Sequence, residues 1–453
     1  MDDEAGVTLS VVAGELIPPA LAIHERTTCV IGRADDCAPR VPDDDAHRTV
    51  SRHHCLLDIN PPDIRVRDFG SLNGTYVNGK KIGQRAPGQT PEEAADGIHP
   101  EHDLSDGDEI RLGSSTIRVA VRAPDRGRTP RRCHCPNCGR GVDDGFADRL
   151  CTVCADDPAA VARGLLDRAR SGDPELDALA GHVLVEELGR GGMGAVYLLC
   201  HETTGERIAL KLMLPRAAAR SSERARFMRE VTLARSLRHP NIVSSYGAHI
   251  PAGVFCFTSE YCAGGSLAQL QDRFGGRMPP HEAVRFVVQA LDGLDHAHRS
   301  GVVHRDLSPH NILLSTEGDG ALVAKIGDFG LAKAFDQAGL SGLTRTGTIA
   351  GKPSYLPRQQ VVNFREAAPA VDVWAAAACL YRMLTGASPR DFPVGRDPWQ
   401  VVLQDPAVPV RRRDPSVPAD LAEVVDRALR DDPEIGVQSA TELRDLLRAA
   451  VPG

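Results

Sequence analysis

The sequence of 453 residues is poor in aromatic side chains, at 4%, and lacks the marks of several protein classes. The sequence has no run of 18 apolar residues, the length that would indicate a membrane-spanning helix. The best candidate, around Ala375–Leu384, is short and contains Arg382. A net charge of −8 gives no general drive toward nucleic acid or anionic membranes. The acidic start, Met1-Asp2-Asp3-Glu4, does not resemble a signal peptide. We therefore expect a cytoplasmic protein of roughly two to four domains, without a membrane partner.

Cysteine is the residue type that clusters: five of the twelve cysteines lie between Cys133 and Cys154. Two CxxC pairs, Cys135–Cys138 and Cys151–Cys154, are separated by twelve residues. Four thiolates at this spacing suit structural Zn²⁺, and the pattern resembles a zinc ribbon over residues 133–156. Cys133 and His134 stay open as alternative ligands, as does the option of reduced thiols without metal. We expect a spacer here, continued by a charged helix over Pro158–Ala178 that links onward.

Residues 1–122 show short alternating apolar stretches separated by turn signals. Examples are Val7–Val12, Cys29–Ile31, Cys55–Ile59 and Ile117–Val121, with turn dipeptides at Asn73-Gly74 and Asn78-Gly79. This pattern predicts an all-β antiparallel sandwich. Residues 84–103 hold several prolines and show no strand period, so we expect a long inserted loop there.

Three loop motifs lie on this predicted sandwich: Gly32-Arg33, Ser51-Arg52-His53-His54 and Ser71-Leu72-Asn73-Gly74-Thr75. Arg, Ser and Asn at one end of a sandwich form an oxyanion-binding set. Their order and spacing resemble a forkhead-associated (FHA) domain, which recognises phosphothreonine. The resemblance implies that Arg33, Ser51 and Asn73 contact the phosphopeptide, that Arg52 is a second cation at the phosphate, and that His54 braces the loop.

Two further motifs carry the set that phosphoryl transfer requires. The stretch His304-Arg305-Asp306-Leu307-Ser308-Pro309-His310-Asn311 offers a carboxylate and, five residues later, an amide, and Asp328-Phe329-Gly330 follows. One carboxylate can orient the attacking hydroxyl and take its proton, while oxygen ligands hold Mg²⁺ against the phosphates. Both stretches resemble the catalytic and metal-binding loops of protein kinases.

A glycine-rich motif precedes them: Gly189-Arg190-Gly191-Gly192-Met193-Gly194-Ala195-Val196. Glycines there let the backbone close over phosphates. A dinucleotide-binding fold shares GxGxxG, but the chain continues as a strand, Arg207–Lys211, and not as a helix, which argues against that alternative. Lys211 in this apolar strand needs an anion. Glu230, on the inner stripe of the expected helix Ser222–Leu237, is the natural partner.

The ordered motifs resemble bacterial serine/threonine protein kinases of α+β bilobal fold over residues 182–450, with an N-lobe (182–260) and a C-lobe (261–450). The resemblance implies Asp306 as catalytic base, Asn311 and Asp328 as Mg²⁺ ligands, and Lys211 on ATP. Glu260 and Cys262 would present backbone groups to adenine. Autophosphorylation is expected at Thr344, Thr346 or Thr348, in the activation-loop stretch. The whole chain is thus expected to be multidomain: sandwich, zinc module and kinase.

The kinase pattern is broken at four places. Ser308 stands where the family has Lys, and Lys352 stands where it has Thr, so the two residue types have exchanged positions. We expect Lys352 to point into the site and replace the missing cation. Pro357-Arg358-Gln359 replaces Ala-Pro-Glu, and Gly436 replaces an Arg that normally pairs with that Glu. Because both charges are gone, we expect a repacked C-lobe.

The sequence leaves two functions open. In the first, an active Ser/Thr kinase phosphorylates proteins, and its FHA domain docks phosphothreonine partners, including its own activation loop. In the second, the chain is a phosphothreonine adapter with a weak or inactive kinase domain. A zinc-dependent nucleic-acid binder is disfavoured by the acidic charge.

Overall fold

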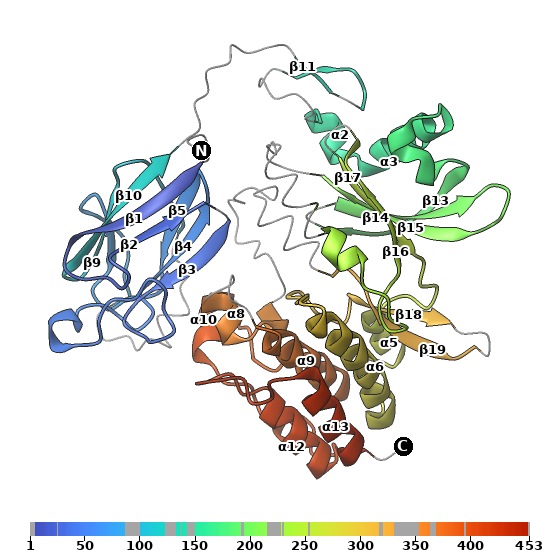
Figure 1. The fold of residues 1–453 in the computed structure, drawn as a ribbon. Coiled ribbons are helices and arrows are strands. Elements are labelled where there is room, and N and C mark those ends of the chain that lie inside the picture. Colours follow the sequence, from blue (N-terminus) through green and yellow to red (C-terminus); the bar gives the residue numbers. More distant parts are fainter. Residues whose placement is uncertain are drawn as a thin grey trace. The chain divides into compact units, whose positions relative to one another are not determined.

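The structure is a computed structural model. It describes residues 5–24, 26–86, 100–122, 133–135, 137–142, 150–191, 194–214, 228, 231–251, 254–316, 320–329, 353–362, 368–393 and 396–451. The chain divides into two compact units. Figure 1 shows its helices and strands, coloured along the sequence. Unit 1 comprises Met1–Asp125, Leu267–Ile312 and Leu343–Gly453, and unit 2 comprises Arg126–Ser266 and Leu313–Gly342. Each unit is described by itself.

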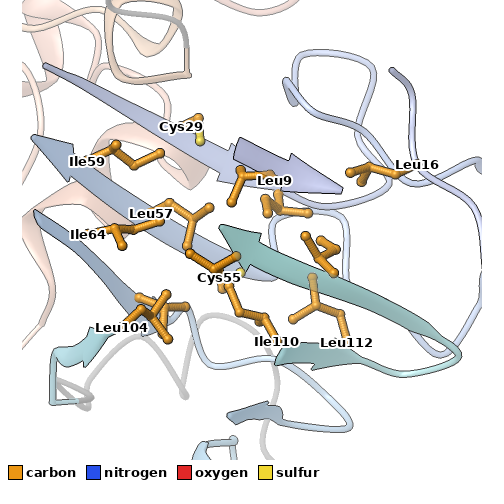
Figure 2. Close-up of a cluster of buried hydrophobic side chains, with 14 of the residues drawn as sticks. Leu9, Leu16, Cys29, Cys55, Leu57, Ile59, Ile64, Leu104, Ile110 and Leu112 are labelled. Atoms are coloured by element: carbon orange, nitrogen blue, oxygen red, sulfur yellow. The ribbon is translucent and has the colours of Figure 1, made fainter. Parts of the chain in front are cut away.

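The N-terminal part of unit 1 is the predicted antiparallel sandwich. One six-stranded sheet has the order β2-β1-β10-β9-β6-β7 and one four-stranded sheet has the order β3-β4-β5-β8. The strands are β1 (Gly6–Ala13), β2 (Ala20–Ile23), β3 (Thr27–Ile31), β4 (Cys55–Asn60), β5 (Asp63–Asp68), β6 (Thr75–Val77), β7 (Lys80–Gly83), β8 (His102–Leu104), β9 (Glu109–Leu112) and β10 (Ser115–Arg122). Alternate residues meet between the sheets, as Figure 2 shows for Leu9, Leu57 and Ile110.

The expected inserted loop is only partly described. Residues 87–99 lie outside the described residues. His102 and Asp103, which we expected to belong to the loop, instead begin β8, which pairs with β5 through Ile64–Leu104 and Val66–His102. A three-residue edge strand is too short to show an alternating pattern in the sequence. Its formation depends on pairing with the neighbouring strand.

The rest of unit 1 is helical. It contains α5 (Leu267–Arg273), α6 (Pro280–Arg299), η4 (Pro353–Tyr355), α8 (Arg358–Val362), α9 (Ala370–Thr385), α10 (Pro398–Gln404), α11 (Val410–Arg413), α12 (Ala419–Ala428) and α13 (Ala440–Ala450). From the sequence we expect buried C-lobe helices over Pro280–Arg299 and Val371–Thr385, and the structure has them as α6 and α9. Helix α9 is buried on nearly every side, which matches its almost unbroken apolar sequence.

Unit 2 is built on a five-stranded antiparallel sheet of order β13-β14-β15-β17-β16. The strands are β13 (His182–Gly191), β14 (Gly194–His201), β15 (Arg207–Met213), β16 (Ser245–His249) and β17 (Phe255–Glu260), and a separate hairpin joins β18 (Ile312–Thr316) to β19 (Leu322–Ile326). In β15, Lys211 points to one face, and Ile208, Leu210 and Leu212 point to the other. This outer face is apolar and requires a cover.

The cover is the segment that we expected to be a linker. Helix α3 (Pro158–Arg170) and the 3-10 turn η2 (Pro174–Leu179) bury their apolar residues in one cluster with the outer face of the sheet. Val161, Leu165 and Leu176 are at most 3% exposed. The linker expectation was therefore wrong for this segment: its stripe at helical spacing packs on the sheet and forms part of the same core.

The cysteine module precedes this helix in the same unit. A short hairpin joins β11 (Cys133–His134) to β12 (Gly141–Val142), and the second CxxC begins helix α2 (Thr152–Asp156), with Cys151 at its N-cap. A ribbon would place a second hairpin there, so in the described residues the module is a hairpin followed by a helix. No helix among the described residues combines the length and the apolar character needed to cross a membrane.

Candidate functional site

The catalytic-loop motif folds into a tight turn in unit 1. The side-chain amide of Asn311 donates to the backbone carbonyl of Asp306 at 2.7 Å and approaches its Oδ2 at 3.4 Å. The backbone N–H of Asn311 donates to the carbonyl of Ser308. Asp306 and Asn311 are both partly exposed, so their oxygens are accessible to a ligand. The predicted carboxylate and amide therefore lie side by side.

Asp372 of α9, a residue that the sequence analysis did not single out, stabilises this turn. Its carboxylate accepts from the backbone N–H groups of His304 and Arg305, both at 2.7 Å, and from His298 Nε2 at 2.8 Å. Burial alone would raise the pKa of Asp372, but the hydrogen bond and charge of His298 outweigh it and hold that pKa below its usual value. The sequence does contain a sign of this role: Asp372 is an acidic residue in the otherwise apolar first turns of α9. A charge buried there requires hydrogen-bond partners.

Backbone strain marks the same turn. Arg305 has φ 64°, an uncommon value for a residue with a side chain. Its N–H is held by Asp372, and its carbonyl accepts from Gln360 Nε2 of α8 at 2.6 Å. Contacts on both sides thus hold the residue before Asp306 in a conformation that it would otherwise leave.

Unit 2 carries the two charged residues expected at the phosphates. Lys211 Nζ lies 2.9 Å from Asp328 Oδ2, and Asp328 has φ 60° in the left-handed region. Val196 pairs with Lys211 across β14 and β15, so both side chains share one face of the sheet. The expected partner Glu230 lies outside the described residues, as does most of the Ser222–Leu237 helix; residues 231–235 are helical.

The glycine-rich stretch forms the ends of β13 and β14. Gly189, Arg190 and Gly191 pair with Val196, Ala195 and Gly194, while Gly192 and Met193 lie outside the described residues. Gly194 has φ +152°, and a Cβ there would lie 1.8 Å from the carbonyl oxygen of Leu212, so only glycine fits. The Arg190 side chain pairs with Glu187 at 2.7 Å.

The expected hinge follows β17. The Glu260 carboxylate pairs with Lys325 at 2.6 Å and accepts from the N–H of Ser244, so this side chain is a structural element. Cys262 is buried, and burial raises the pKa of its thiol to about 12. The expectation that the two residues present their backbone groups to adenine stays a prediction.

Local contacts explain two of the departures from the kinase pattern, Gln359 and Gly436. The Gln359 side-chain amide donates to the carbonyl of Asp431 at 2.8 Å, and the Asp431 carboxylate accepts from Arg390 and from the N–H of Arg358. A Cβ on Gly436 would lie 2.1 Å from the carbonyl oxygen of Arg427, so this backbone has no room for a side chain. Ser308 is 2% exposed, and Lys352 lies outside the described residues.

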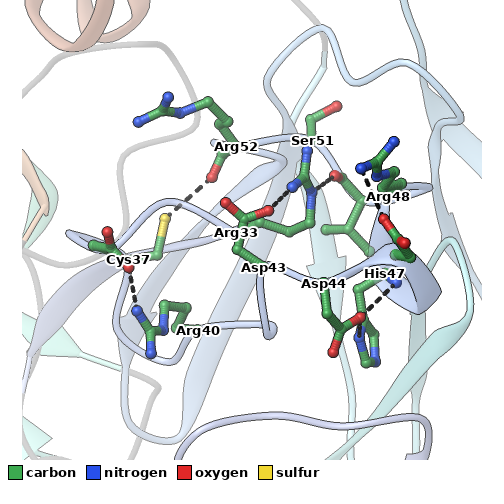
Figure 3. Close-up of polar contacts among 12 residues, drawn as sticks. Arg33, Cys37, Arg40, Asp43, Asp44, His47, Arg48, Ser51 and Arg52 are labelled. Atoms are coloured by element: carbon green, nitrogen blue, oxygen red, sulfur yellow. Dashed lines mark hydrogen bonds and ion pairs between the residues drawn. The ribbon is translucent and has the colours of Figure 1, made fainter.

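The three loops of the sandwich meet as expected. Arg33 Nε donates to the Val50 carbonyl at 2.6 Å, and its guanidinium pairs with Asp43 (Figure 3). Ser51 Oγ accepts from the N–H of Leu72, and Asn73 Nδ2 donates to the Thr49 carbonyl.

Two other residues of these loops have distinct positions. Arg52 is exposed, and its side chain points away from the Arg33 guanidinium in Figure 3. His54 is fully buried, accepts from the N–H of Ser51 at Nδ1 and donates from Nε2 to the Gly74 carbonyl. Burial lowers the pKa of His54. The expectation that His54 braces the loop is confirmed.

The four cysteines of the two CxxC pairs come together. The Sγ atoms of Cys135, Cys138, Cys151 and Cys154 all lie within 4.8 Å of one another. Cys138 and Cys151 are 3.6 Å apart at Sγ, close to the roughly 3.8 Å edge of a tetrahedral zinc–thiolate site. Asn137 Nδ2 donates to Cys154 Sγ at 3.3 Å. The donor set and its spacing fit Zn²⁺.

Comparison with known proteins agrees with this geometry. A model of the protein kinase domain matches residues 182–435, and a model of the FHA domain matches residues 29–113. The chain belongs to the protein kinase family. Its kinase domain follows an N-terminal FHA domain, and each has the motifs described above.

Similar proteins share mainly the kinase domain. The serine/threonine-protein kinase PknB of Mycobacterium leprae is 34% identical over 268 residues, 58% of this chain and 42% of that protein. The serine/threonine-protein kinase pkn2 of Myxococcus xanthus is 31% identical over 269 residues, 59% of this chain and 32% of that protein. The matches thus span less than half the length of these relatives. The crystal structure of the Mycobacterium tuberculosis PknI kinase domain aligns with TM-score 0.47 and 28% identity, covering 60% of this chain and 97% of that one.

Proposed function

We propose that this protein is an active serine/threonine protein kinase that transfers the γ-phosphate of ATP to protein hydroxyl groups. The observation that carries the proposal is the catalytic loop. Asp306 and Asn311 lie together on a strained turn that the buried Asp372 holds by two backbone hydrogen bonds. Such strain persists only where the surroundings impose it, and it is typical of active sites and ligand-binding sites.

Each residue of the site has a chemical task. Asp306 orients the acceptor hydroxyl and takes its proton, while Lys211 holds the α- and β-phosphates. Asn311 and Asp328 would supply the oxygen ligands for Mg²⁺, and the bound ion would neutralise charge on the phosphates. Lys211 pairs with Asp328 at 2.9 Å, which places the two charged groups that would serve the phosphates and the metal next to each other.

The test separates the kinase from the adapter. Purified protein should transfer radiolabelled γ-phosphate to a generic Ser/Thr protein substrate, and Asp306→Asn should abolish transfer while ATP binding persists. Binding of ATP without transfer by the unchanged protein would favour the adapter, and absence of both would refute each proposal.

The exchanged residues Ser308 and Lys352 belong to the same proposal. The buried Ser308 lies two residues after Asp306, where an amine would approach the transferred phosphate. We expect Lys352 to supply that amine from the substrate-side loop, because the transition state requires a nearby cation and not a particular loop. The double change Ser308→Lys with Lys352→Thr should then retain activity, whereas Ser308→Lys alone places two amines at the site and should lower it.

The N-terminal domain is proposed to bind phosphothreonine through Arg33, Ser51 and Asn73, with Arg52 as an exposed second cation. The burial of His54 and its bonds to two loops support a preformed site. Fluorescence anisotropy with a phosphothreonine peptide should show binding that Arg33→Ala weakens at least about tenfold. Arg48→Ala is the matched control, since Arg48 is exposed and pairs with Asp45, three residues earlier.

The four clustered cysteines are proposed to hold one structural Zn²⁺. The cluster shares a hydrophobic core with α3 and the sheet that carries Lys211, so metal loss should destabilise unit 2. Elemental analysis should find about one zinc per chain, reduced by Cys154→Ser and unaffected by Cys200→Ser, which lies in β14 outside the cluster. Full metal retention by Cys154→Ser would count against the assignment.

A further inference from the structure

One outward face of the sandwich carries apolar side chains where a free domain would carry polar ones. Along β3 and β4, Cys29 and Leu57 point into the sandwich core, so their neighbours Val30 and Leu56 point outward. Yet Val30 is 0% exposed and Leu56 is 7% exposed. This face of the sheet is therefore covered by another part of unit 1.

The cover is the C-lobe surface made by α8 and α10. Apolar residues of both domains form one buried cluster: Val30, Ala34, Cys37, Leu56 and Phe69 from the sandwich, with Leu356, Val361, Val362, Val402 and Leu403 from the C-lobe. We call this cluster the docking face. Burial of so many apolar groups drives association without help from charge.

Two ion pairs fix the orientation of the docking face. Arg358 Nε lies 2.8 Å from Asp36 Oδ2, and Arg67 lies 2.8 Å from Asp397 in a pair whose side chains are 9% and 1% exposed. Arg358 is one of the residues that replace Ala-Pro-Glu. This departure from the kinase pattern therefore has its partner in the FHA domain.

The docking face borders the phosphothreonine loop on one side and the catalytic loop on the other. His53, next to Ser51 and Arg52, donates from Nε2 to Asp36 at 2.9 Å, and Asp36 pairs with Arg358. Two residues further along α8, Gln360 bonds the carbonyl of Arg305, the residue before Asp306. A short series of contacts thus connects the two loops within one compact unit.

We propose that this kinase selects substrates that already carry a phosphothreonine close to the acceptor residue. The inference rests on the proposed kinase and phosphothreonine-binding functions. A peptide held at Arg33 stays beside the C-lobe, so its acceptor hydroxyl reaches Asp306 at a high effective concentration. The transfer itself is unchanged. The acceptor oxygen bonds the γ-phosphorus, the bond to ADP breaks, the proton passes to Asp306, and the first phosphate stays in place.

The test compares two peptides that differ by one phosphate. Each carries residues 341–350 of this chain, then a Gly/Ser spacer of about 4 to 20 residues, then a second acceptor copy of the same residues. In one peptide Thr344 of the first copy is phosphorylated. The phosphorylated peptide should show a kcat/KM at least about tenfold higher at its best spacer length, and the gain should fall with longer spacers. Arg33→Ala should remove the gain.

Disrupting the docking face tests its part in the selection. Leu56→Asp places a carboxylate in the apolar cluster, and the carboxylate becomes solvated once the outward face of β4 separates from the C-lobe. Phosphopeptide affinity should stay unchanged, while the preference for the phosphorylated peptide should drop several-fold and lose its spacer dependence. Val12→Asp, at an exposed position of β1, is the matched control and should keep the preference. If Leu56→Asp loses phosphopeptide binding, Arg358→Glu, on the C-lobe side, gives the same test.

The outcomes are distinct. Equal kcat/KM for both peptides, with phosphopeptide binding intact, would overturn the selection while leaving the kinase and the FHA functions standing. An unchanged preference after undocking would overturn the role of the docking face. No transfer to either peptide would refute the proposed kinase activity itself.

Discussion

Replacing Gln359 with Glu tests whether the C-lobe has been repacked around its missing ion pair. Gln359 donates to the Asp431 carbonyl at 2.8 Å. The Glu carboxylate would remove that donor and place a negative charge beside Asp431, whose carboxylate is already paired with Arg390. Leaving a partly buried carbonyl without its donor costs about 1–3 kcal/mol, and the added charge a further ~1 kcal/mol. We expect the free energy of unfolding of the C-lobe to fall by roughly 2–4 kcal/mol.

Tryptophan fluorescence is the natural assay, because both tryptophans of the chain, Trp374 and Trp399, lie in the C-lobe. Trp374 is fully buried and donates to the Leu429 carbonyl, so its emission reports the unfolding of this region. The guanidinium midpoint should fall for Gln359→Glu, and less for Gln359→Met, which removes the donor without adding charge. Below about pH 4 the protonated Glu can donate again, so its deficit should shrink.

The family pair should not be recoverable here. Adding Gly436→Arg to Gln359→Glu should lower stability further, because any Cβ at Gly436 meets the carbonyl of Arg427 at 2.1 Å. A midpoint for Gln359→Glu equal to or above that of the unchanged protein would refute the repacking argument. So would rescue by Arg at position 436.

Three other outcomes are expected. Lys352→Ala should cut kcat by roughly 10²-fold in steady-state assays if its amine serves the phosphate near Asp306, and full activity would end that hypothesis. Asp43→Asn should tighten phosphothreonine-peptide binding by about two- to fivefold in anisotropy titrations, because the carboxylate that pairs with Arg33 competes with phosphate; weaker binding would contradict this. His54 has a lowered pKa in the fold, so sandwich stability should be full above about pH 6.5 and decline as pH falls below it, a decline that circular dichroism should show reduced in His54→Gln.

Local sequence was enough to predict the elements whose pattern is set by near neighbours. Alternation over Cys55–Ile59 predicted β4, and the helix predicted over Pro280–Arg299 is α6 with the bounds that the structure has. The loop from Asp306 to Asn311 was predicted to carry a catalytic carboxylate and a metal-binding amide together, because their five-residue spacing is fixed by the covalent chain. The clustering of Cys135, Cys138, Cys151 and Cys154 likewise follows from short loops.

The features that the sequence did not predict depend on contacts between segments far apart in the chain. The α3 segment was predicted as a charged helix that links onward, because nothing nearby in the sequence identifies the outer face of β15 as its packing partner. Asp372 was not predicted because its hydrogen-bond donors, the N–H groups of His304 and Arg305, lie 68 and 67 positions away.

The sequence by itself determined which chemistry this protein carries, because reactive residue types and their short spacings are covalent properties of the chain. Only the tertiary structure decided how that chemistry is held. In the sequence, Arg358 is only a departure from a kinase motif. In the structure its guanidinium pairs with Asp36, 322 positions away. The sequence placed Val30 and Leu56 in strands but did not show what their side chains contact. The structure shows that α8 and α10 cover them. Burial and ion pairing depend on which surfaces meet, and that is a property of the folded chain alone.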